Sequence, residues 1–487
     1  MSGTVGIVGA GPGGIVTAAV FARDGFDVTV YEKFDEVGGT WSSERRYVGL
    51  AAQADSGIFE FSDEPNDTPF PDAEDVQSYL REYARKHGVY DDVAFETEVV
   101  GLAERERGWA VELSDADTGR TETARHDYVV VCSGLHHVPE VPDVPGRERF
   151  EGAVLHTSEV DSHSVLEDRD VVTVGFGKSA LDLSVEASRA GASSTLVFRR
   201  ACWHIPRRLL GGQVPYKYLL FSRLGGSLLP QFPHDEVVRP IDRLPARLKD
   251  LLWAAITRDF VYSGGLGDLD ELVPSNGLPD DIARSGVYPD EFAGRVADGA
   301  ITPEKARVER FESDGVVLST GGKVLADLVV FGTGFRQEYP FLDASPLDLR
   351  TDDGLFAAYR SLVPPETDRI GFVGLRQTHN NFLSMEVSAH WLAAYFQGEL
   401  PSMPTTEEMY ADVERRLQWF RETLPRNQGY DFGPYVVHTP EQLLLDMGIG
   451  PNQAPNPLAE YLAPVKARWY DDLHEKRVAA TRDGASG

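Results

Sequence analysis

The sequence predicts an α/β fold that contains two parallel-sheet units in one chain. The prediction depends on a repeat, in which a short apolar strand, a glycine-rich turn, a helix and a second strand occur near the N-terminus and again after position 170. A strand, a helix and a parallel strand within about 30 residues form one βαβ unit with a right-handed crossover. The 487 residues correspond to about three average domains, so both units fit with residues to spare.

The first unit is predicted from a strand at 5–8, a helix at 14–24 with apolar residues at helical spacing, and a strand at 28–31. The turn at 9–14 reads Gly-Ala-Gly-Pro-Gly-Gly, which has the spacing G-x-G-x-x-G. The first glycine of such a turn permits the tight bend, the second lets the backbone approach a pyrophosphate, and the third lets helix and strand pack. Glu32 ends the second strand about 20 residues further on, where a carboxylate accepts both ribose hydroxyls of a dinucleotide.

The second unit repeats this order with a strand at 171–174, a helix that ends at Ala190 and a strand at 195–198. Its turn at 175–180 reads Gly-Phe-Gly-Lys-Ser-Ala, and alanine is a permitted variant at the packing position. Arg199 and Arg200 stand where the first unit has Glu32. A carboxylate there would repel a 2′-phosphate, whereas guanidinium groups bind it. The second unit is therefore predicted to bind NADP(H) rather than NAD(H).

Two dinucleotide sites on one chain limit the chemistry, because one cofactor must pass a hydride to the other. The cofactor without a 2′-phosphate is expected to be FAD, and the hydride donor is expected to be NADPH. Cys132 and Cys202 are too far apart in the sequence to form a C-x-x-C redox pair. Oxygen or a small molecule is therefore left as the electron acceptor.

The rest of the chain supplies elements around the two units. Expected helices and strands lie at 73–87, 109–113, 127–132, 327–331, 382–396 and 405–424, the last helix opened by the capping pair Thr405 and Glu408. Residues 137–146 contain three prolines in seven positions, which predicts an extended connector. The segment 209–272 is expected to be a helical insertion with its own small core, and a substrate lid or a shallow membrane contact is the alternative.

Composition excludes several classes of protein. The chain has 77 acidic and 47 basic residues and a net charge of −30, so nucleic acid is not an expected partner. Two cysteines exclude a disulfide framework and favour a reducing compartment. The sequence lacks a basic signal region and a run of 18 apolar residues, so we expect a cytoplasmic protein without a transmembrane segment. No metal-ligand spacing is present, and no metal is expected.

Further motifs resemble those of flavin-containing monooxygenases. Residues 150–156 (Phe-Glu-Gly-Ala-Val-Leu-His) are similar to the family signature F-x-G-x-x-x-H. Residues 38–41 (Gly-Gly-Thr-Trp) are similar to its flavin-contacting G-G-x-W, and residues 331–335 (Phe-Gly-Thr-Gly-Phe) to its F-A-T-G-F strand end. Residues 60–63 (Glu-Phe-Ser-Asp) and 445–448 (Leu-Asp-Met-Gly) look most like the plant-type branch, which includes amine N-hydroxylating members.

The resemblance implies an enzyme that uses NADPH, FAD and O₂ on a small-molecule substrate. In the family, NADPH reduces FAD, and oxygen adds to flavin carbon 4a to give a hydroperoxide that oxidises a soft nitrogen or sulfur nucleophile. Gln53 falls where many animal-type members carry an asparagine near the flavin and nicotinamide, and it is the one expected catalytic residue. Val160 stands where the family usually has an aromatic residue and Baeyer–Villiger relatives have tryptophan, which argues against lactone formation. His156 is expected to tie the connector in place rather than to act as a base.

The sequence thus predicts a domain organisation and a set of site residues. The FAD domain is expected to comprise residues 1–163 and 325–487, with an NADPH domain at 164–324 inserted between them. The residues expected to contact a cofactor are Gly9, Gly11, Pro12, Gly13, Gly14, Glu32, Lys33, Gly39, Thr40, Trp41, Gln53, Val99, Gly175, Gly177, Lys178, Ser179, Ala180, Arg199, Arg200, Thr333 and Gly334. Three points stay open: a Baeyer–Villiger reaction on ketones, a flavin-dependent NADPH oxidase or reductase without an oxygenated product, and assembly as a homodimer.

Overall fold

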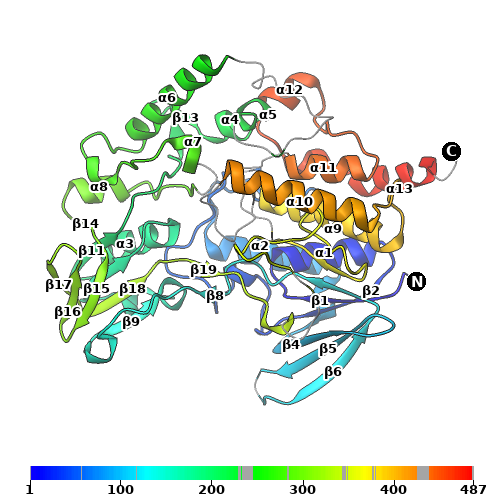
Figure 1. Ribbon diagram of the computed structural model, residues 1–487, viewed down its shortest axis with the longest axis horizontal. Helices are drawn as coiled ribbons and strands as arrows, with labels where there is room; N and C mark the ends of the chain where they lie inside the picture. The colour runs from blue at the N-terminus through cyan, green and yellow to red at the C-terminus, as the bar shows by residue number, and fades with distance from the viewer. Residues whose placement is uncertain are drawn as a thin grey trace.

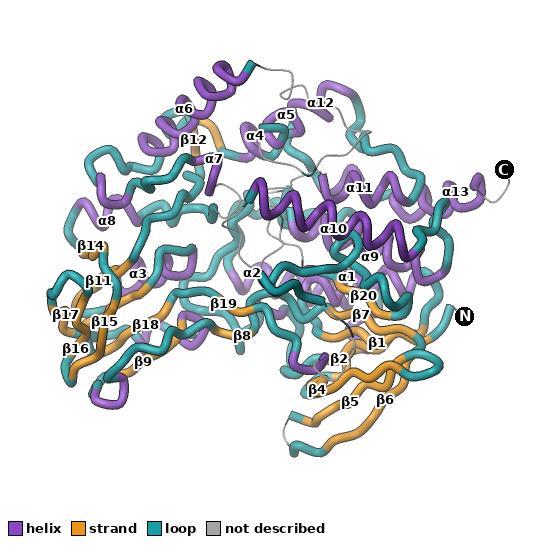
Figure 2. Tube along the Cα trace, in the orientation of Figure 1, coloured by secondary structure: helices purple, strands orange, loops and turns teal. Residues whose placement is uncertain are grey.

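The computed structural model describes residues 2–484 except positions 56, 117, 348 and 379 and the segments 229–231, 233–244, 282–284, 343–346, 376–377 and 425–437. Two groups of strands lie apart in the molecule, and two short strands, β8 and β19, run between them (Figures 1 and 2). β8 (Val138–Pro139) pairs antiparallel with β19 (Phe335–Arg336), so the chain crosses between the groups at these two places. The expected proline-rich connector at 137–146 contains the first of these crossings.

The first unit is a five-stranded parallel sheet. Its strands, in spatial order, are β20 (Ile370–Phe372), β7 (Tyr128–Val131), β1 (Thr4–Val8), β2 (Asp27–Tyr31) and β3 (Val93–Ala94). The middle strands β7 and β1 consist mainly of buried valine and isoleucine, as expected for parallel strands that are covered on both faces. An antiparallel sheet lies below it in Figure 1 and contains β4 (Thr97–Glu104), β5 (Trp109–Asp115) and β6 (Thr121–His126).

The second unit is another five-stranded parallel sheet. Its strands, in spatial order, are β14 (Thr302–Lys305), β11 (Ser193–Phe198), β10 (Asp170–Val174), β18 (Leu328–Phe331) and β9 (Ala153–His156). A three-stranded antiparallel sheet extends this unit with β15 (Val308–Glu312), β16 (Gly315–Leu318) and β17 (Lys323–Leu325). The repeat seen in the sequence therefore corresponds to two separate sheets, which confirms the α/β prediction.

Helices pack on both sheets. The first unit carries α1 (Pro12–Arg23), α2 (Ala73–Lys86), α9 (Asn381–Gln397), α10 (Thr406–Thr423), α11 (His438–Asp446), α12 (Pro457–Leu462) and α13 (Leu473–Gly484), and the second carries α3 (Lys178–Ala190) and α8 (Phe292–Ala297). The hydroxyl of Thr405 and the carboxylate of Glu408 cap the start of α10 as predicted. α9 packs along α1, and its residues between Phe382 and Phe396 are nearly all buried.

Two strands belong to a different sheet than the expected domain boundaries imply. β9 and β18 were assigned to the FAD domain, yet β18 pairs with β10 and with β9 in the second sheet. Glycine turns identify the first βαβ unit of each sheet, and they do not reveal which other strands complete it. All four residues of β18 are buried, as expected for a strand with a neighbour on each side. We propose that the inserted unit extends from Ala153 to Phe331.

The described part of the insertion at 209–272 does not have a core of its own. Its described part contains a short hairpin of β12 (Arg208–Leu209) and β13 (Val214–Pro215), followed by α4 (Lys217–Leu220), α5 (Arg223–Gly226) and α6 (Ala246–Ser263). The buried side chains of Leu209, Tyr216, Leu220, Phe221 and Phe260 join the hydrophobic core of the first unit. The expectation of a separate helical core was therefore wrong, because apolar periodicity does not specify the partner surface.

An ion-pair cluster fixes this insertion to the C-terminal helices. Arg223 on α5 pairs with Glu441 on α11 and Glu460 on α12, and all three side chains are largely buried. A buried carboxylate that lost its arginine would remain uncompensated in a low-dielectric environment. Among the described residues, no helix has the length and apolar character needed to cross a membrane.

Candidate cofactor and active site

The first glycine turn lies where the carboxyl end of β1 leads into α1. Gly9 has a φ of 98°, a conformation that favours glycine. A Cβ on Gly14 would lie 1.8 Å from the carbonyl oxygen of Gly9, so only glycine fits there. α1 begins at Pro12 after Gly11, which has no side chain, and its first turn has no acidic residue. Unpaired backbone N–H groups and the positive end of the helix dipole therefore provide a site for a pyrophosphate.

Glu32 is fixed beside this turn. Its carboxylate accepts hydrogen bonds from the backbone nitrogens of Ala10 at 2.8 Å and Phe34 at 3.1 Å. Burial raises the pKa of Glu32, and these hydrogen bonds act in the opposite direction. The carboxylate of Glu32 lies next to the phosphate turn, as a ligand of a dinucleotide ribose requires.

Two other predicted residues lie close to Glu32. The nitrogen of Thr97 donates to the carbonyl of Glu32 at 2.8 Å, which places β4 and its buried residue Val99 next to this ribose site. Lys33 is exposed, and its ammonium lies 5.1 Å from the ring centroid of Phe34.

The segment Gly39–Trp41 packs directly against the phosphate turn as a short 3₁₀ helix. The nitrogen of Gly38 donates to the carbonyl of Ala10 at 3.0 Å, and a Cβ on Gly39 would lie 3.0 Å from the Cα of Gly11. Thr40 is exposed and Trp41 is half-buried. The backbone of this motif thus contacts the first glycine turn closely. This position fits the contribution to flavin binding that was expected of it.

The second turn occupies the corresponding place between β10 and α3. Gly175 has a φ of 139°, and the space around a Cβ on Gly177 is open. Lys178 forms an ion pair with Asp182 one turn further along α3, and the hydroxyl of Tyr47 donates to the same carboxylate at 2.7 Å. The lysine charge is therefore held on its own helix, and the backbone N–H groups at the start of α3 are left for a pyrophosphate.

Ala180 explains a departure in the 331–335 motif. The family has alanine where this chain has Gly332, and a Cβ on Gly332 would lie 2.6 Å from the Cβ of Ala180. In the first unit the glycine is on the helix and the larger residue follows the strand. Gly14 of α1 faces Cys132, which follows β7 as Gly332 follows β18. One small residue is therefore present at each helix-to-strand contact.

This complementarity predicts the outcome of two substitutions. Gly332→Ala is expected to destabilise the protein by about 1–3 kcal/mol, because an added methyl group overpacks a buried contact. Adding Ala180→Gly should restore only part of that loss, because it removes the closest contact and leaves the Cα and the nitrogen of residue 180 at 2.8 and 3.0 Å from the added Cβ. Ala180→Gly alone costs helix stability. Chemical unfolding of the two single variants and the double variant measures the coupling. Additive destabilisation in the double variant would contradict the proposed contact.

Arg199 and Arg200 follow β11 and are exposed. Their position beyond the carboxyl end of the strand next to β10 matches that of Glu32 in the first unit. In a chain with a net charge of −30, two adjacent guanidinium groups provide local attraction for a 2′-phosphate.

Thr333 and Gly334 lie at a crossing between the units. The hydroxyl of Thr333 donates to the carbonyl of Glu140, and the nitrogen of Glu140 donates to the carbonyl of Gly334 at 2.9 Å. His156 is fully buried, with Nε2 2.9 Å from the carbonyl oxygen of Gly334 and Nδ1 2.8 Å from the hydroxyl of Ser158. Burial lowers the pKa of His156 and favours neutral imidazole. These contacts agree with the structural role expected of this histidine.

Gln53 connects the two units beside the second turn. Its side-chain oxygen accepts a hydrogen bond of 2.7 Å from the backbone nitrogen of Val287. Its backbone carbonyl accepts one of 2.5 Å from the hydroxyl of Tyr216. A Cβ on Gly286 would lie 2.9 Å from the side-chain oxygen of Gln53 and 3.3 Å from the Cβ of Lys178. A side chain from the FAD unit thus reaches the start of α3 in the NADPH unit.

Sequence reasoning did not assign two residues near this junction. His204 is buried, and burial lowers its pKa to about 4, so its imidazole is neutral. Arg207 lies 4.3 Å from the ring centroid of Phe70 and pairs with Asp290 at 3.3 Å. In the sequence these two residues appear only as a histidine and an arginine in an apolar stretch after a strand. That pattern does not reveal that they lie close to Gln53.

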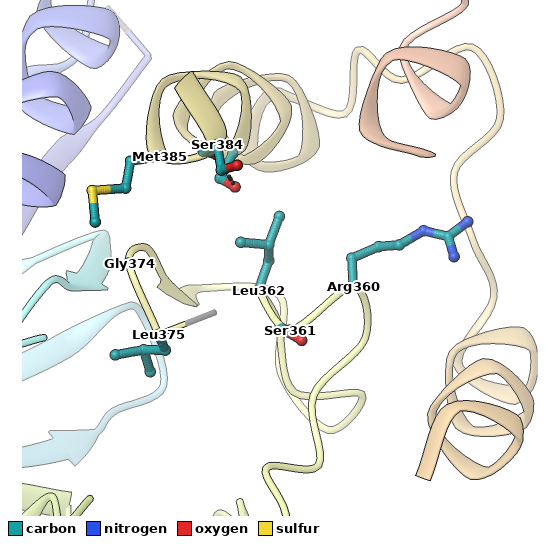
Figure 3. A pocket seen from close by; sticks show the side chains of 8 residues that line it. Arg360, Ser361, Leu362, Gly374, Leu375, Ser384 and Met385 are labelled. Carbon is teal, nitrogen blue, oxygen red and sulfur yellow. Dashed lines mark hydrogen bonds between the residues drawn. The ribbon is translucent and has the colours of Figure 1, made fainter. Parts of the chain in front are cut away.

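A small pocket lies between α9 and the turn that follows β20 (Figure 3). Its lining residues are Arg360, Ser361, Leu362, Gly374, Leu375, Ser384, Met385 and Ser388. The guanidinium of Arg360 points away from the pocket in Figure 3 and pairs with Asp412 and Asp446. None of the predicted site residues lines this pocket, so it is separate from the junction at Gln53.

Two motifs of the resemblance prove to anchor α9. The nitrogen and hydroxyl of Ser62 both donate to the carboxylate of Glu386 on α9, and burial raises the pKa of Glu386 to about 7. Asp446 accepts hydrogen bonds from Arg360 at 2.8 Å and from the indole of Trp391 at 3.1 Å. Residues 60–63 and 445–448 therefore hold the helix whose N-terminal end lies near the first glycine turn.

Two dinucleotide turns on two parallel sheets define a flavoprotein oxidoreductase that takes a second, nicotinamide cofactor. Comparison with known families matches residues 2–250 and 271–453 to the family described as flavin-binding monooxygenase-like. The chain belongs to this family and is a flavin-containing monooxygenase, with FAD and NADPH as the confirmed cofactors.

Known proteins are similar to this chain in sequence, and solved structures are similar to it in fold. The chain is 26% identical to the probable flavin-containing monooxygenase 1 of Arabidopsis thaliana, over 96% of each chain. It is 25% identical to dimethylaniline monooxygenase (N-oxide-forming) 2 of Oryctolagus cuniculus, over 93% of this chain and 84% of that protein. The fold is similar to S-allyl-L-cysteine S-oxygenase from Allium sativum, with a TM-score of 0.63, 22% identity and coverage of 99% and 98%. It is also similar to cyclohexanone monooxygenase from Rhodococcus sp. Phi1, with a TM-score of 0.64, 18% identity and coverage of 92% and 97%.

Proposed function

We propose that this protein uses NADPH and O₂ to insert one oxygen atom into a soft nitrogen or sulfur nucleophile of a small molecule. The observation that carries the proposal is the position of Gln53, which extends from the FAD unit to the start of α3 beside Val287 and Lys178. A nicotinamide cofactor seated on the second turn would pass this residue on its way to the flavin. N-oxidation and S-oxidation are also the reactions named for two of the similar proteins.

The residues of the chain have distinct roles in this proposal. The N-terminal ends of α1 and α3 bind the two pyrophosphates, Glu32 accepts the ribose hydroxyls of FAD, and the arginines after β11 select NADPH. The flavin supplies the redox and oxygen chemistry once it is bound. Because the oxygen of the Gln53 carboxamide is already used by Val287, its NH₂ group is the part that can donate to a reacting oxygen. A glutamine can thus take the place of the family's usual asparagine.

Val160 supports heteroatom oxidation over a Baeyer–Villiger reaction. Its side chain is fully buried in a cluster with Leu166, Val171 and Leu183. Its carbonyl also accepts a hydrogen bond of 2.8 Å from the nitrogen of Val48. The tryptophan that Baeyer–Villiger relatives have at this position would overpack the buried site of Val160. The arrangement of those relatives around the tryptophan is therefore not expected here.

Rapid mixing of the NADPH-reduced holoenzyme with oxygenated buffer tests the proposal. We expect a long-lived absorbance of an oxygen adduct of the flavin, which decays faster when an amine or a thioether is added. The product should carry one extra oxygen atom by mass spectrometry. Hydrogen peroxide as the sole product would contradict oxygenation and favour the oxidase alternative, and an ester formed from a cyclic ketone would favour the Baeyer–Villiger alternative.

The Gln53→Leu variant tests the role of that residue. We expect the lifetime of the oxygen adduct to fall about tenfold, because one donated hydrogen bond to a charged or polar oxygen is lost. The rate of flavin reduction by NADPH should change little. Equal losses in both steps would indicate that Gln53 only holds the two units together through Val287.

A further inference from the structure

Asn380 is a buried residue whose side-chain amide has no hydrogen-bond partner among the described residues. It is 1% exposed, and neither its side-chain oxygen nor its side-chain nitrogen makes a hydrogen bond to any of them. Buried polar groups in folded proteins are paired in the great majority of cases, because an unpaired buried amide costs free energy. An amide with both ends unpaired therefore indicates that a bound molecule satisfies it.

The position of Asn380 supplies a second feature of a ligand site. It directly precedes α9, a helix of 17 residues whose first turn contains no acidic residue. The first N–H groups of a helix have no partner within the helix, and they carry the positive end of its dipole. The unpaired amide of Asn380 thus lies at a helix end that favours an acceptor oxygen with partial negative charge.

Two independent sets of contacts place this helix end at the first glycine turn. Phe382 in the first turn of α9 lies 4.1 Å from Phe59 between ring centroids, and Phe59 lies 5.3 Å from Trp41. On the other side, a Cβ on Gly13 would lie 3.3 Å from the carbonyl oxygen of Val373, which follows β20 and leads toward α9. The N-terminal ends of α1 and α9 therefore flank the same site.

We propose that Asn380 positions the flavin by hydrogen bonding to the pyrimidine edge of its ring system. This edge presents a carbonyl, an imide N–H and a second carbonyl in a row, which complement the NH₂ donor and the carbonyl acceptor of one carboxamide. The inference rests on the proposed function only in taking the first glycine turn as the flavin site. It adds a positioning residue that the glycine motifs do not contain.

Reconstitution of the apoprotein with FAD tests this assignment. In Asn380→Leu, which keeps the volume and removes both polar groups, we expect the Kd for FAD to rise about tenfold. The Tm of the apoprotein should rise, because an unpaired buried amide has been removed, while the gain in Tm on adding FAD should shrink. Ser388→Ala is the matched control, since Ser388 lies two turns further along α9 and its hydroxyl donates to the carbonyl of Ser384 on the same helix.

A modified cofactor identifies the contacted edge. FAD methylated at the imide nitrogen should bind more weakly than FAD to the wild-type protein, whereas Asn380→Leu should bind both forms equally. Unchanged FAD affinity in Asn380→Leu, or equal loss for the methylated form in both proteins, would overturn the inference. Asn380→Ala provides the same measurements if the leucine variant does not fold. Failure of the wild-type protein to bind FAD would instead count against the proposed function.

Discussion

Gly14→Ala is expected to abolish FAD binding and to destabilise the apoprotein by about 3 kcal/mol or more. The added Cβ would lie 1.8 Å from the carbonyl oxygen of Gly9 and 3.0 Å from its carbonyl carbon, which are backbone atoms. The turn cannot yield without moving β1 away from α1, because Gly9 is also hydrogen-bonded to Tyr31 at 2.8 Å. The pyrophosphate site would then lose its shape. Thermal unfolding of the apoprotein and the bound FAD content of the purified variant measure the two effects.

Gly294→Ala is the matched control for this prediction. Gly294 lies in α8 and is exposed, and a Cβ there meets no atom within 4 Å. Alanine is favoured over glycine in a helix, so this variant should keep FAD and be slightly more stable. Normal FAD content in Gly14→Ala would mean that the first turn does not bind the cofactor.

The double variant Arg199→Ala/Arg200→Ala is expected to weaken NADPH binding about 100-fold. Each guanidinium is expected to contribute one charge-assisted contact to the 2′-phosphate, and each such contact is worth about tenfold or more in affinity. NADH lacks that phosphate, so its affinity should change by less than about threefold. Rates of flavin reduction at a series of NADPH and NADH concentrations give both dissociation constants.

Arg105→Ala/Arg107→Ala removes the same charge from another part of the surface. Both arginines are exposed in the turn between β4 and β5 of the first unit. This variant should bind NADPH like the wild-type protein, apart from a small uniform change from the net charge. A parallel loss of NADPH and NADH affinity in the Arg199/Arg200 variant would show that these residues do not read the 2′-phosphate.

Local sequence signals predicted the two units because their physical causes are local. Each unit has three such features within about 30 residues. They are a glycine with positive φ, a helix that begins without a side-chain cap, and an acidic or basic residue at the end of the next strand. The structure places Gly9, Gly175, Glu32, Arg199 and Arg200 accordingly. The same holds for the helix caps, since Thr405 and Glu408 interact across a single turn.

Longer-range features were predicted less well. The predicted boundaries put β9 and β18 with the FAD domain, whereas both strands pair in the second sheet, and the described part of the insertion packs on the core of the first unit. Strand order and packing partners depend on contacts far apart in the chain. The contacts that join the two units at the site also connect residues far apart in the chain, such as Gln53 and Val287. The size exchange between Ala180 and Gly332 is another example.

The sequence by itself determined the fold class and the positions of the two glycine turns, and it predicted a cofactor for each turn, since these features depend on backbone conformation and charge within one βαβ unit. The tertiary structure alone decided where the two units meet, which side chain reaches across and which buried amide lacks a partner. These properties depend on how sheets, helices and connectors pack together. Asn380 has no motif around it, and only the folded structure shows that it is buried and that both ends of its amide lack a partner among the described residues.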